Sequence, residues 1–457
     1  MASHRRIIFD ISSTAQSLGP PVGILRRERE IAGYALAKRP DIVFSFFDKP
    51  TSSFFAVERY WAERLIRWDH ALDTTTAEVR RQRKGMGRLR PSRYLLTVAL
   101  ERRRLMSRRL QVHRLVDLGQ RLIWLPGRLP SPFTDHQHQR LGVVPRDLAL
   151  ARQHVLGAND LVISVGNDWI DKDAEAIARL KRRFGFGYVV MCHDLIPLQF
   201  PDFFPARFPS RYLRHWLTTF SIADRILVNS RTIERDIRGF SRIAGLEVGE
   251  IVLVQPGCDL VRADQAATLP AGLEAGKFAL FVGTIEPRKG HAMLIEVWRR
   301  LLAEGIPQRS GFKLVFAGRP GWKVDEVLRQ IADANSFQGT LFHFAGIDDR
   351  GLAGLYRGAA FCLLPSLYEG FGVPIVEAFA HGKAVIASDG GALPETVGPF
   401  SPCLPARDDQ AWFATIRRWI QDHGARAPYE AKIRASFAHP RWSEATAGIF
   451  DAAMNGL

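Results

Sequence analysis

The sequence lacks the features that mark several large classes of protein. Its four cysteines (Cys192, Cys258, Cys362 and Cys403) lie far apart, and none has the short Cys or His spacing of a zinc site. No apolar run approaches the roughly 20 residues that a membrane-spanning helix requires. The P-loop motif GxxxxGK(S/T) and the dinucleotide-binding motif GxGxxG are both absent. We therefore expect buried reduced thiols, no metal site, no membrane span and no Walker-type loop.

Acidic residues are in deficit, and the deficit is concentrated in one segment. The chain of 457 residues carries a net charge of +16, and the stretch Arg80–Arg109 holds twelve Lys and Arg residues against one acid, Glu101. The remainder is mildly basic, which disfavours a protein that coats nucleic acid. The length of 457 residues indicates two or three domains, and the hydrophobic content of 46% indicates a folded globular protein.

The basic segment brackets an apolar patch at Tyr94–Leu100. An amphipathic basic stretch of this kind can bind an anionic lipid surface, and a solvated helical face is the alternative. The first residues, MASHRRIIFDISS, are too polar for a signal peptide. We therefore expect a cytoplasmic protein, with a peripheral position at the inner face of the membrane as the hypothesis for Arg80–Arg109.

Short apolar runs alternate with amphipathic stretches over most of the chain. The runs that predict buried strands are 5–12, 41–48, 160–166, 188–192, 223–230, 251–254, 278–284, 313–318, 340–346, 361–366 and 384–388. Helices are predicted near 24–39, 60–68, 177–184, 230–240, 291–302, 324–334, 375–382 and 442–454. This alternation predicts an α/β protein with parallel sheets.

One stretch, 361–398, carries the clearest chemistry. An apolar run ends at Pro365, a loop with Glu369 follows, and Pro374 stands where a helix would begin. Glu377 then lies about one turn inside that helix. Glycines allow close approach of a ligand, and two carboxylates at this spacing can accept bonds from vicinal hydroxyls. The alternative is a plain turn between two solvated acids.

The stretch resembles the donor-site signature of retaining GT-B glycosyltransferases of the family-four type. In that family two glutamates are separated by seven residues around a GFG-like turn, and here the segment reads EGFGVPIVE, followed by ALPETVG. The resemblance implies two Rossmann-like parallel-sheet domains that face each other across a cleft. It implies an acceptor-side domain at 1–262 with the basic insertion at about 70–120, a nucleotide-sugar domain at 275–435, and a final helix, 436–457, that crosses back.

Two further motifs extend the resemblance. Arg288 and Lys289 follow a predicted strand and precede a helix, and two cations at a helix N-terminus suit a diphosphate. They resemble the EPRKG motif of the family, although some relatives have an arginine where this chain has Thr284. The sequence HDLIP, which starts at His193, resembles a subgroup that includes polysaccharide mannosyltransferases, in which the histidine faces the transferred sugar.

The resemblance also implies roles for individual residues. Glu377 would bind the ribose hydroxyls, while Glu369 and His193 would act on the transferred sugar as the catalytic residues. The remaining expected donor-binding residues are Gly23, Gly283, Thr284, Arg288, Lys289, Gly346, Phe371, Gly372 and Val373. The resemblance implies neither a metal ion nor a cofactor.

The sequence therefore predicts a retaining glycosyltransferase that takes a hexosyl unit from a nucleotide diphosphate sugar, with GDP-mannose as first choice. The expected acceptor is a glycan or lipid-linked glycan in polysaccharide biosynthesis, and no nucleic-acid partner is expected. Rhamnose, glucose and N-acetylhexosamine donors fit the same pattern. Two alternatives stay open: another GT-B enzyme, such as an epimerase or a phosphorylase, and an inactive scaffold that binds nucleic acid or a membrane surface through its basic segment.

Overall fold

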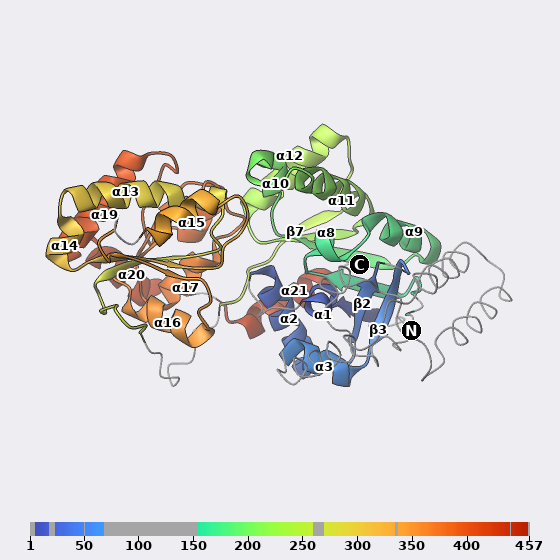
Figure 1. Cartoon of the computed structure of the whole chain (residues 1–457). Helices are drawn as coiled ribbons and strands as arrows, with labels where there is room; N and C mark the ends of the chain where they lie inside the picture. Colours follow the sequence, from blue (N-terminus) through green and yellow to red (C-terminus); the bar gives the residue numbers. More distant parts are fainter. Residues whose placement is uncertain are drawn as a thin grey trace, which may run out of the picture.

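The computed structural model describes residues 5–17, 23–49, 51–67, 154, 156–258, 269–333, 337–438 and 440–455. The predicted insertion at about 70–120, with Arg80–Arg109, lies outside these ranges. Two α/β domains lie side by side, as Figure 1 shows. Within the described ranges, no helix combines the length and the apolar character that crossing a membrane would require.

The N-terminal domain is built on a seven-stranded sheet in the order β3-β2-β1-β4-β5-β6-β7. Its neighbouring strands are parallel, except that β2 and β3 are antiparallel at one edge. The strands are β1 (Arg6–Asp10), β2 (Val43–Asp48), β3 (Ser53–Val57), β4 (Asp160–Ser164), β5 (Gly187–Cys192), β6 (Arg225–Val228) and β7 (Glu250–Leu253). The predicted parallel α/β architecture is confirmed for this domain, with β3 as an unpredicted edge strand.

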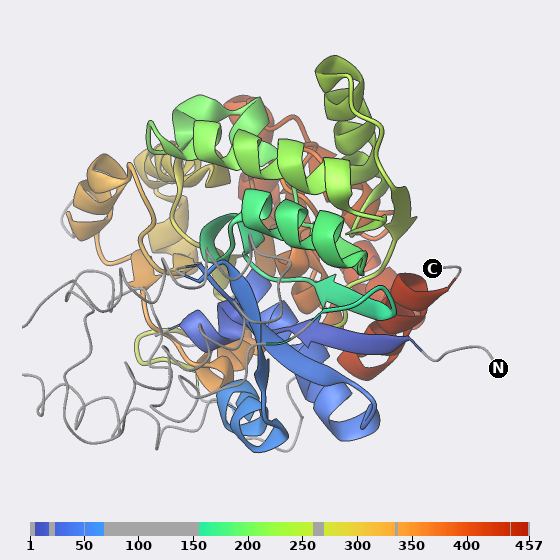
Figure 2. The ribbon, with the colours of Figure 1, turned by 90° about the vertical axis from the view of Figure 1, so that its right-hand side faces the viewer.

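Helices cover both faces of this sheet (Figure 2). Alternate residues of β1 point to opposite faces, so Ile7 and Phe9 belong to one core cluster and Ile8 belongs to the other. One face carries α2 (Ile24–Lys38), α3 (Arg59–Arg67) and α21 (Trp442–Met454), and the other carries α9 (Ala174–Phe184), α11 (Phe208–Ile222) and α12 (Arg231–Ala244). Shorter helices are α1 (Ser12–Gln16), α8 (Asp168–Asp171) and α10 (Ile196–Gln199).

The C-terminal domain has a six-stranded parallel sheet in the order β10-β9-β8-β11-β12-β13. The strands are β8 (Phe278–Val282), β9 (Lys313–Ala317), β10 (Leu341–Phe344), β11 (Phe361–Leu364), β12 (Val385–Ser388) and β13 (Cys403–Leu404). The helices are α13 (His291–Ala303), α14 (Ile306–Ser310), α15 (Asp325–Ala332), α16 (Asp349–Gly358), α17 (Val373–Ala380), α18 (Leu393–Val397), α19 (Asp409–Gln421) and α20 (Ala427–Ser436). One continuous apolar core unites them.

Local sequence explains where the helices begin and end. Ser230 caps α12, because its hydroxyl accepts a hydrogen bond from the amide of Ile233 at 3.2 Å, as the sequence predicts. Gly245 ends the same helix with a positive φ of 63°, a conformation that glycine adopts without steric cost.

The last helix returns to the N-terminal domain. Ile449 and Phe450 of α21 pack into the core cluster that contains Phe9. The guanidinium of Arg225 in β6 donates to the carbonyl of Ala452 at 2.7 Å. Strand β1 and helix α21 therefore share one apolar core.

The two domains also contact each other directly, at the N-terminus of α12. The carboxylate of Glu395 in α18 accepts hydrogen bonds from the amides of Arg231, at 2.9 Å, and of Thr232, at 2.8 Å. An anionic acceptor at a helix N-terminus satisfies free amides and suits the helix dipole. On the other side of the interface, the indole N–H of Trp322 donates to the carbonyl of Phe203 at 2.7 Å.

We predict that Glu395→Ala loosens this interface. Loss of a carboxylate acceptor at a helix N-terminus lowers the free energy of unfolding by about 0.5–2 kcal/mol. In a domain of this size, each kcal/mol lowers the midpoint of thermal unfolding by about 2–4 °C. Differential scanning calorimetry measures the midpoint, and small-angle X-ray scattering reports whether the radius of gyration rises.

The matched control is Glu304→Ala, which removes an exposed ion pair with Arg417 inside the C-terminal domain. Such surface pairs contribute little to stability. If Glu395→Ala has the same thermal midpoint and the same scattering profile as this control, the predicted role of the contact is wrong.

Candidate active site

The strand order fixes where the candidate site lies in the C-terminal domain. The sheet order reverses at β8, because β9 lies on one side of it and β11 on the other. In open parallel sheets, ligands bind beside the carboxyl ends of the strands at such a reversal. The chain segments that follow β8 and β11 contain the EPRKG motif and Glu369, so the topology brings these two motifs together.

Side chains from the two segments form a buried ion-pair cluster. Lys289 Nζ lies 2.5 Å from Glu369 Oε1, and Arg288 Nη1 lies 3.0 Å from Glu369 Oε2. Arg288 Nε also lies 3.2 Å from Glu286 Oε2. The guanidinium further donates to the carbonyl of Tyr368 at 2.9 Å. One carboxylate thus holds two cations in place at the carboxyl edge of the sheet.

The cluster shifts the protonation of its members. Burial alone would raise the pKa of Glu369, but the attraction of Arg288 and Lys289 outweighs it and holds the pKa at about 2. Burial and the neighbouring Arg288 lower the pKa of Lys289. Burial raises the pKa of Glu286. Glu369 is therefore an anion at any physiological pH, and its lone pairs can also accept bonds from sugar hydroxyls.

The loop between Glu369 and α17 approaches the N-terminal domain closely. A Cβ atom at Gly370 would lie 2.3 Å from the carbonyl oxygen of His193, so only glycine permits this approach. The hydroxyl of Ser230 donates to the carbonyl of Gly370 at 2.9 Å. Gly372 has a φ of 94° and forms the N-cap of α17, so Val373 begins the helix. Phe371, Gly372 and Val373 therefore stand at this helix N-terminus, as predicted from the sequence.

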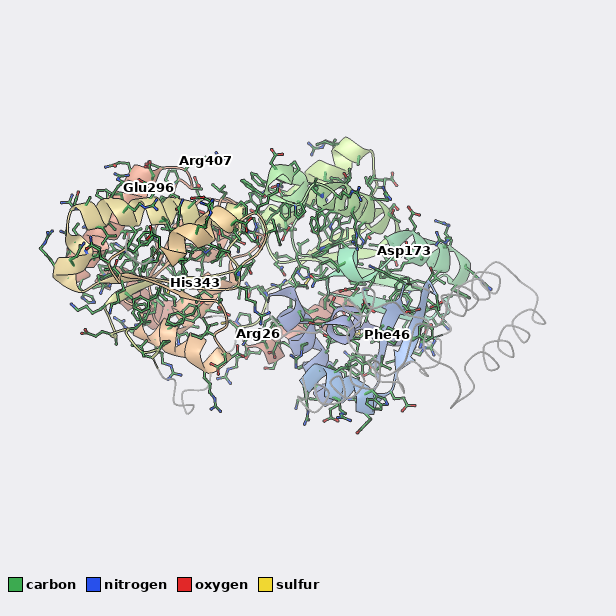
Figure 3. The ribbon with its side chains drawn as sticks, viewed as in Figure 1. Arg26, Phe46, Asp173, Glu296, His343 and Arg407 are labelled. Atoms are coloured by element: carbon green, nitrogen blue, oxygen red, sulfur yellow. The ribbon has the colours of Figure 1, made fainter. Side chains whose placement is uncertain are left out.

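Glu377 lies apart from the ion-pair cluster, on α17. The hydroxyl of Tyr356 donates to Glu377 Oε2 at 2.7 Å, and burial raises the pKa of the carboxyl group. The charge of Arg26 in α2 acts on Glu377 from the N-terminal domain, and Arg26 Nη1 also lies 3.5 Å from Asp349. Figure 3 labels Arg26 on the side of its domain that faces the C-terminal domain.

His193 stands directly after β5 and is 5% exposed. Its Nδ1 atom lies 2.8 Å from Arg27 Nη1, and its Nε2 atom lies 2.9 Å from the carbonyl of Val165. Burial and the charge of Arg27 lower the pKa of His193 to about 3. The structure therefore brings the histidine next to Gly370, but both ring nitrogens are bonded within the N-terminal domain.

The other predicted residues are spread around this region. Gly283 and Thr284 follow β8, and the stem of Lys289 passes 4.0 Å from where a Cβ of Gly283 would lie. Gly23 is the N-cap of α2, and Gly346 lies after β10 with no heavy atom near its Cβ direction. Among the described residues, no group of three or more His, Cys, Asp or Glu side chains is placed to hold a metal ion.

Sequence reasoning missed four charged residues of this region: Arg26, Arg27, Asp194 and Glu286. Glu286 and Asp194 stand inside the motifs EPRKG and HDLIP, and Arg26 stands three residues after Gly23, so the position of these residues in the sequence was a signal. Nothing in the sequence marks Arg27, which lies in a run of charged residues and yet is 7% exposed.

The family comparison agrees with this geometry. Residues 271–435 match the model of glycosyl transferases group 1. The C-terminal domain belongs to this family. The match contains the EPRKG motif, Glu369 and Glu377, and it confirms the resemblance predicted from the sequence.

Curated relatives match this glycosyl transferase domain and its surroundings. The chain is similar to an O-antigen chain mannosyltransferase B of Escherichia coli, with 33% identity over 175 residues, or 38% of this chain and 45% of the relative. It is also similar to a D-inositol 3-phosphate glycosyltransferase of Streptomyces avermitilis, with 28% identity over 247 residues, or 51% of this chain and 52% of the relative. The chain thus spans about half, or less, of these relatives' length.

A solved structure extends the likeness to both domains. The crystal structure of Anabaena HepE in complex with UDP and glucose has a TM-score of 0.56 and 16% identity, and the match covers 98% of this chain and 99% of that chain. Two Rossmann-like domains in this arrangement confirm the predicted GT-B fold.

We predict that the contribution of Glu369 to stability depends on pH. Its pKa is about 2 in the folded protein, against 4.5 without these partners, so its stabilising effect is complete above about pH 4.5 and is lost as pH falls toward 2. Thermal unfolding of the wild type and of Glu369→Gln should therefore differ most near pH 7, and the gap should narrow between pH 4.5 and 2.

Glu304→Gln serves as control, because Glu304 forms an exposed pair with Arg417. We expect a small difference from the wild type for this control at every pH. A Glu369→Gln gap that stays constant down to pH 2.5 would show that the ion pairs do not hold the carboxylate as the geometry indicates.

Proposed function

We propose that this protein is a retaining glycosyltransferase that transfers a hexosyl unit from a nucleotide diphosphate sugar to a glycan or lipid-linked glycan. The observation that carries the proposal is the cluster of Arg288, Lys289 and Glu369 at the reversal of strand order in a group 1 glycosyl transferase domain. Arg288 and Lys289 can bind a diphosphate, and Glu369 can accept hydrogen bonds from hydroxyl groups, so the cluster suits a ligand that has both.

The two cations are suited to the leaving group. Negative charge develops on the departing diphosphate, and preorganised positive charge in a buried site stabilises it most effectively. Glu369 already holds Arg288 and Lys289 in fixed positions, so little reorganisation is required when the donor binds. Because protein side chains supply this positive charge, the proposed reaction requires no metal ion.

In the proposed reaction, the acceptor hydroxyl oxygen bonds to the anomeric carbon while the bond from that carbon to the diphosphate oxygen breaks. The acceptor proton passes to the leaving phosphate oxygen on the same face, which retains the anomeric configuration. No protein nucleophile is assigned. Glu369 holds sugar hydroxyls beside this centre, Glu377 binds the ribose, and the approach of the two domains at Gly370 excludes water that would hydrolyse the donor.

Mannose from GDP-mannose is the proposed donor. The similarity to mannosyltransferases of Escherichia coli and of Mycolicibacterium hassiacum, the latter with 30% identity over 154 residues, supports this choice. The similarity to an inositol phosphate glycosyltransferase makes a different sugar the main competing choice. An inactive scaffold that binds nucleic acid or lipid is the second candidate function, supported by the charge of +16.

We predict that GDP and GDP-mannose bind and stabilise the protein more than UDP or dTDP and their sugars do. Lys289→Ala removes a charge-assisted bond worth about 1.5–3 kcal/mol, so the dissociation constant should rise roughly 10- to 150-fold. Isothermal titration calorimetry measures the constants, and Lys432→Ala, an exposed lysine on α20, is the matched control.

Each result separates the alternatives. Selective binding of UDP or dTDP would keep a glycosyltransferase and overturn the mannose donor. Binding of no nucleotide at all, together with salt-sensitive binding of RNA, would favour the inactive scaffold. For an active enzyme, proton NMR of the first product from an α-linked donor should show an α linkage, and a β linkage would overturn retention.

A further inference from the structure

Arg27 is a buried arginine that contacts His193. It lies on α2 and is 7% exposed, and its Nη1 atom is 2.8 Å from His193 Nδ1 and 3.7 Å from Met191 Sδ. A guanidinium group is always a donor, so His193 Nδ1 must be the acceptor and carries no proton. The proton of the ring therefore sits on Nε2, which donates to the carbonyl of Val165 at 2.9 Å.

No acidic side chain among the described residues pairs with Arg27. Other arginines with little exposure do have such partners: Arg225 is 4% exposed and pairs with Glu250, and the side chain of Arg288 is 14% exposed and pairs with Glu369. Burial lowers the pKa of Arg27 to about 10, since no anion compensates its charge. A buried cation without a counter-ion costs stability. An apolar side chain could fill this place without that cost, so the hydrogen bond to His193 is the interaction that distinguishes the arginine.

That neighbour stands where the two domains meet. The backbone carbonyl of His193 faces Gly370, whose loop begins with Glu369. Its ring connects α2 with the turn that follows β4, through Arg27 on one nitrogen and Val165 on the other. The ring accepts one hydrogen bond, from Arg27, and donates one, to Val165. These two bonds together set the orientation of the ring and the position of the carboxyl end of β5.

We propose that Arg27 is a positioning residue, which fixes the orientation and the Nε2–H tautomer of His193 and thereby the place of the strand end against the donor-side loop. The proposal deepens the proposed function and rests on it for the effect on turnover. The hydrogen-bond arrangement itself does not depend on any activity.

The groups that surround the His193 ring determine its protonation state. Arg27 faces it from α2, the carbonyls of Val165 and Gly166 face it from the turn after β4, and Trp169 of α8 packs at a ring-centroid distance of 6.3 Å. No carboxylate in the described part of the chain bonds to the ring. His193 therefore stays neutral through the physiological range, in line with a pKa of about 3.

The first experiment is histidine-selective ¹⁵N NMR of the whole protein, with the His193 signal assigned by its loss in His193→Gln. We expect the wild type to show a single Nε2–H tautomer that does not titrate between pH 5 and 8. A protonated or Nδ1–H form of His193 in the wild type would overturn the proposal without any Arg27 variant.

The second experiment compares Arg27→Met with Arg27→Lys. Methionine removes the donor to Nδ1 but leaves the bond from Nε2–H to Val165, so the ¹⁵N signal of the unprotonated Nδ1 should move to that of an imidazole nitrogen without a hydrogen bond. We expect kcat to fall about tenfold with little change in the KM for the donor, because the ring is then held on one side only. Lysine can still donate to Nδ1, and it should restore the wild-type Nδ1 signal and most of the lost kcat. Arg29→Met is the matched control on the same helix, because Arg29 donates to the carbonyl of Ile66 in α3 instead.

The results distinguish positioning from packing. If Arg27→Met keeps the wild-type ¹⁵N signal of Nδ1, or if its kcat falls no more than that of Arg29→Met, Arg27 is only a packing residue and the proposal is wrong. If the wild type turns over no nucleotide sugar, the proposed function fails, whereas the ¹⁵N measurement still decides the relation between Arg27 and His193.

Discussion

The attraction between Glu369 and its two cations is the interaction on which the rest of the site depends. Arg288 and Glu369 are far apart in the sequence and are joined only because β8 and β11 are neighbours in the sheet. The backbone follows the same pairing, since the amide of Leu367 donates to the carbonyl of Arg288 at 2.7 Å. A buried charge without a partner is costly, so each loop holds the other in its conformation.

The same loop also connects the site to the interface between the domains. Tyr368, next to Glu369, donates from its hydroxyl to Asp236 of α12 at 2.5 Å, and the carbonyl of Gly370 accepts from Ser230 at the start of that helix. Glu395 reaches the same helix end from α18. The loop that contains Glu369 is thus bonded on one side to Arg288 and Lys289 and on the other to the N-terminal domain. These contacts connect the ion pairs directly with the interface between the domains.

The sequence predicted the strands and the placement of its motifs well, for a physical reason. Buried parallel strands are short apolar runs, and the residues after them must lie at the carboxyl edge of the sheet, so EPRKG, HDLIP and Glu369 were correctly placed after the ends of β8, β5 and β11. The antiparallel strand β3 was missed, because its five residues, SFFAV, follow β2 after only a short turn. In that turn the amide of Thr51 donates to Asp48 at 2.9 Å.

Side-chain partners could not be predicted in the same way. The pattern of Glu369 and Glu377 indicates two similar carboxylates, yet one lies between two cations and the other accepts from Tyr356. Their environments depend on which strands are neighbours and on how closely the domains approach. A run of five consecutive charged residues, Arg26–Glu30, likewise indicates a solvated helix start. Instead, α2 enters the interior of the domain, and Arg27 and Glu28 are both buried there.

The buried charges of the N-terminal domain are consistent with the proposal that the diphosphate site belongs to the other domain. The N-terminal sheet has its own reversal of strand order at β1, where Lys172 Nζ lies 2.6 Å from Asp10 and 2.9 Å from Asp168. These side chains are almost fully enclosed, and the ammonium group also donates to Ser164. Two acids already neutralise the single cation, so a phosphate here would meet net negative charge. At β8 the balance is less negative, because the ion pairs join two cations, Arg288 and Lys289, with two carboxylates, Glu369 and Glu286. Equivalent places in two similar sheets thus differ in the charge of their ion pairs, and the proposed anionic donor would meet less repulsion from those pairs at the C-terminal one.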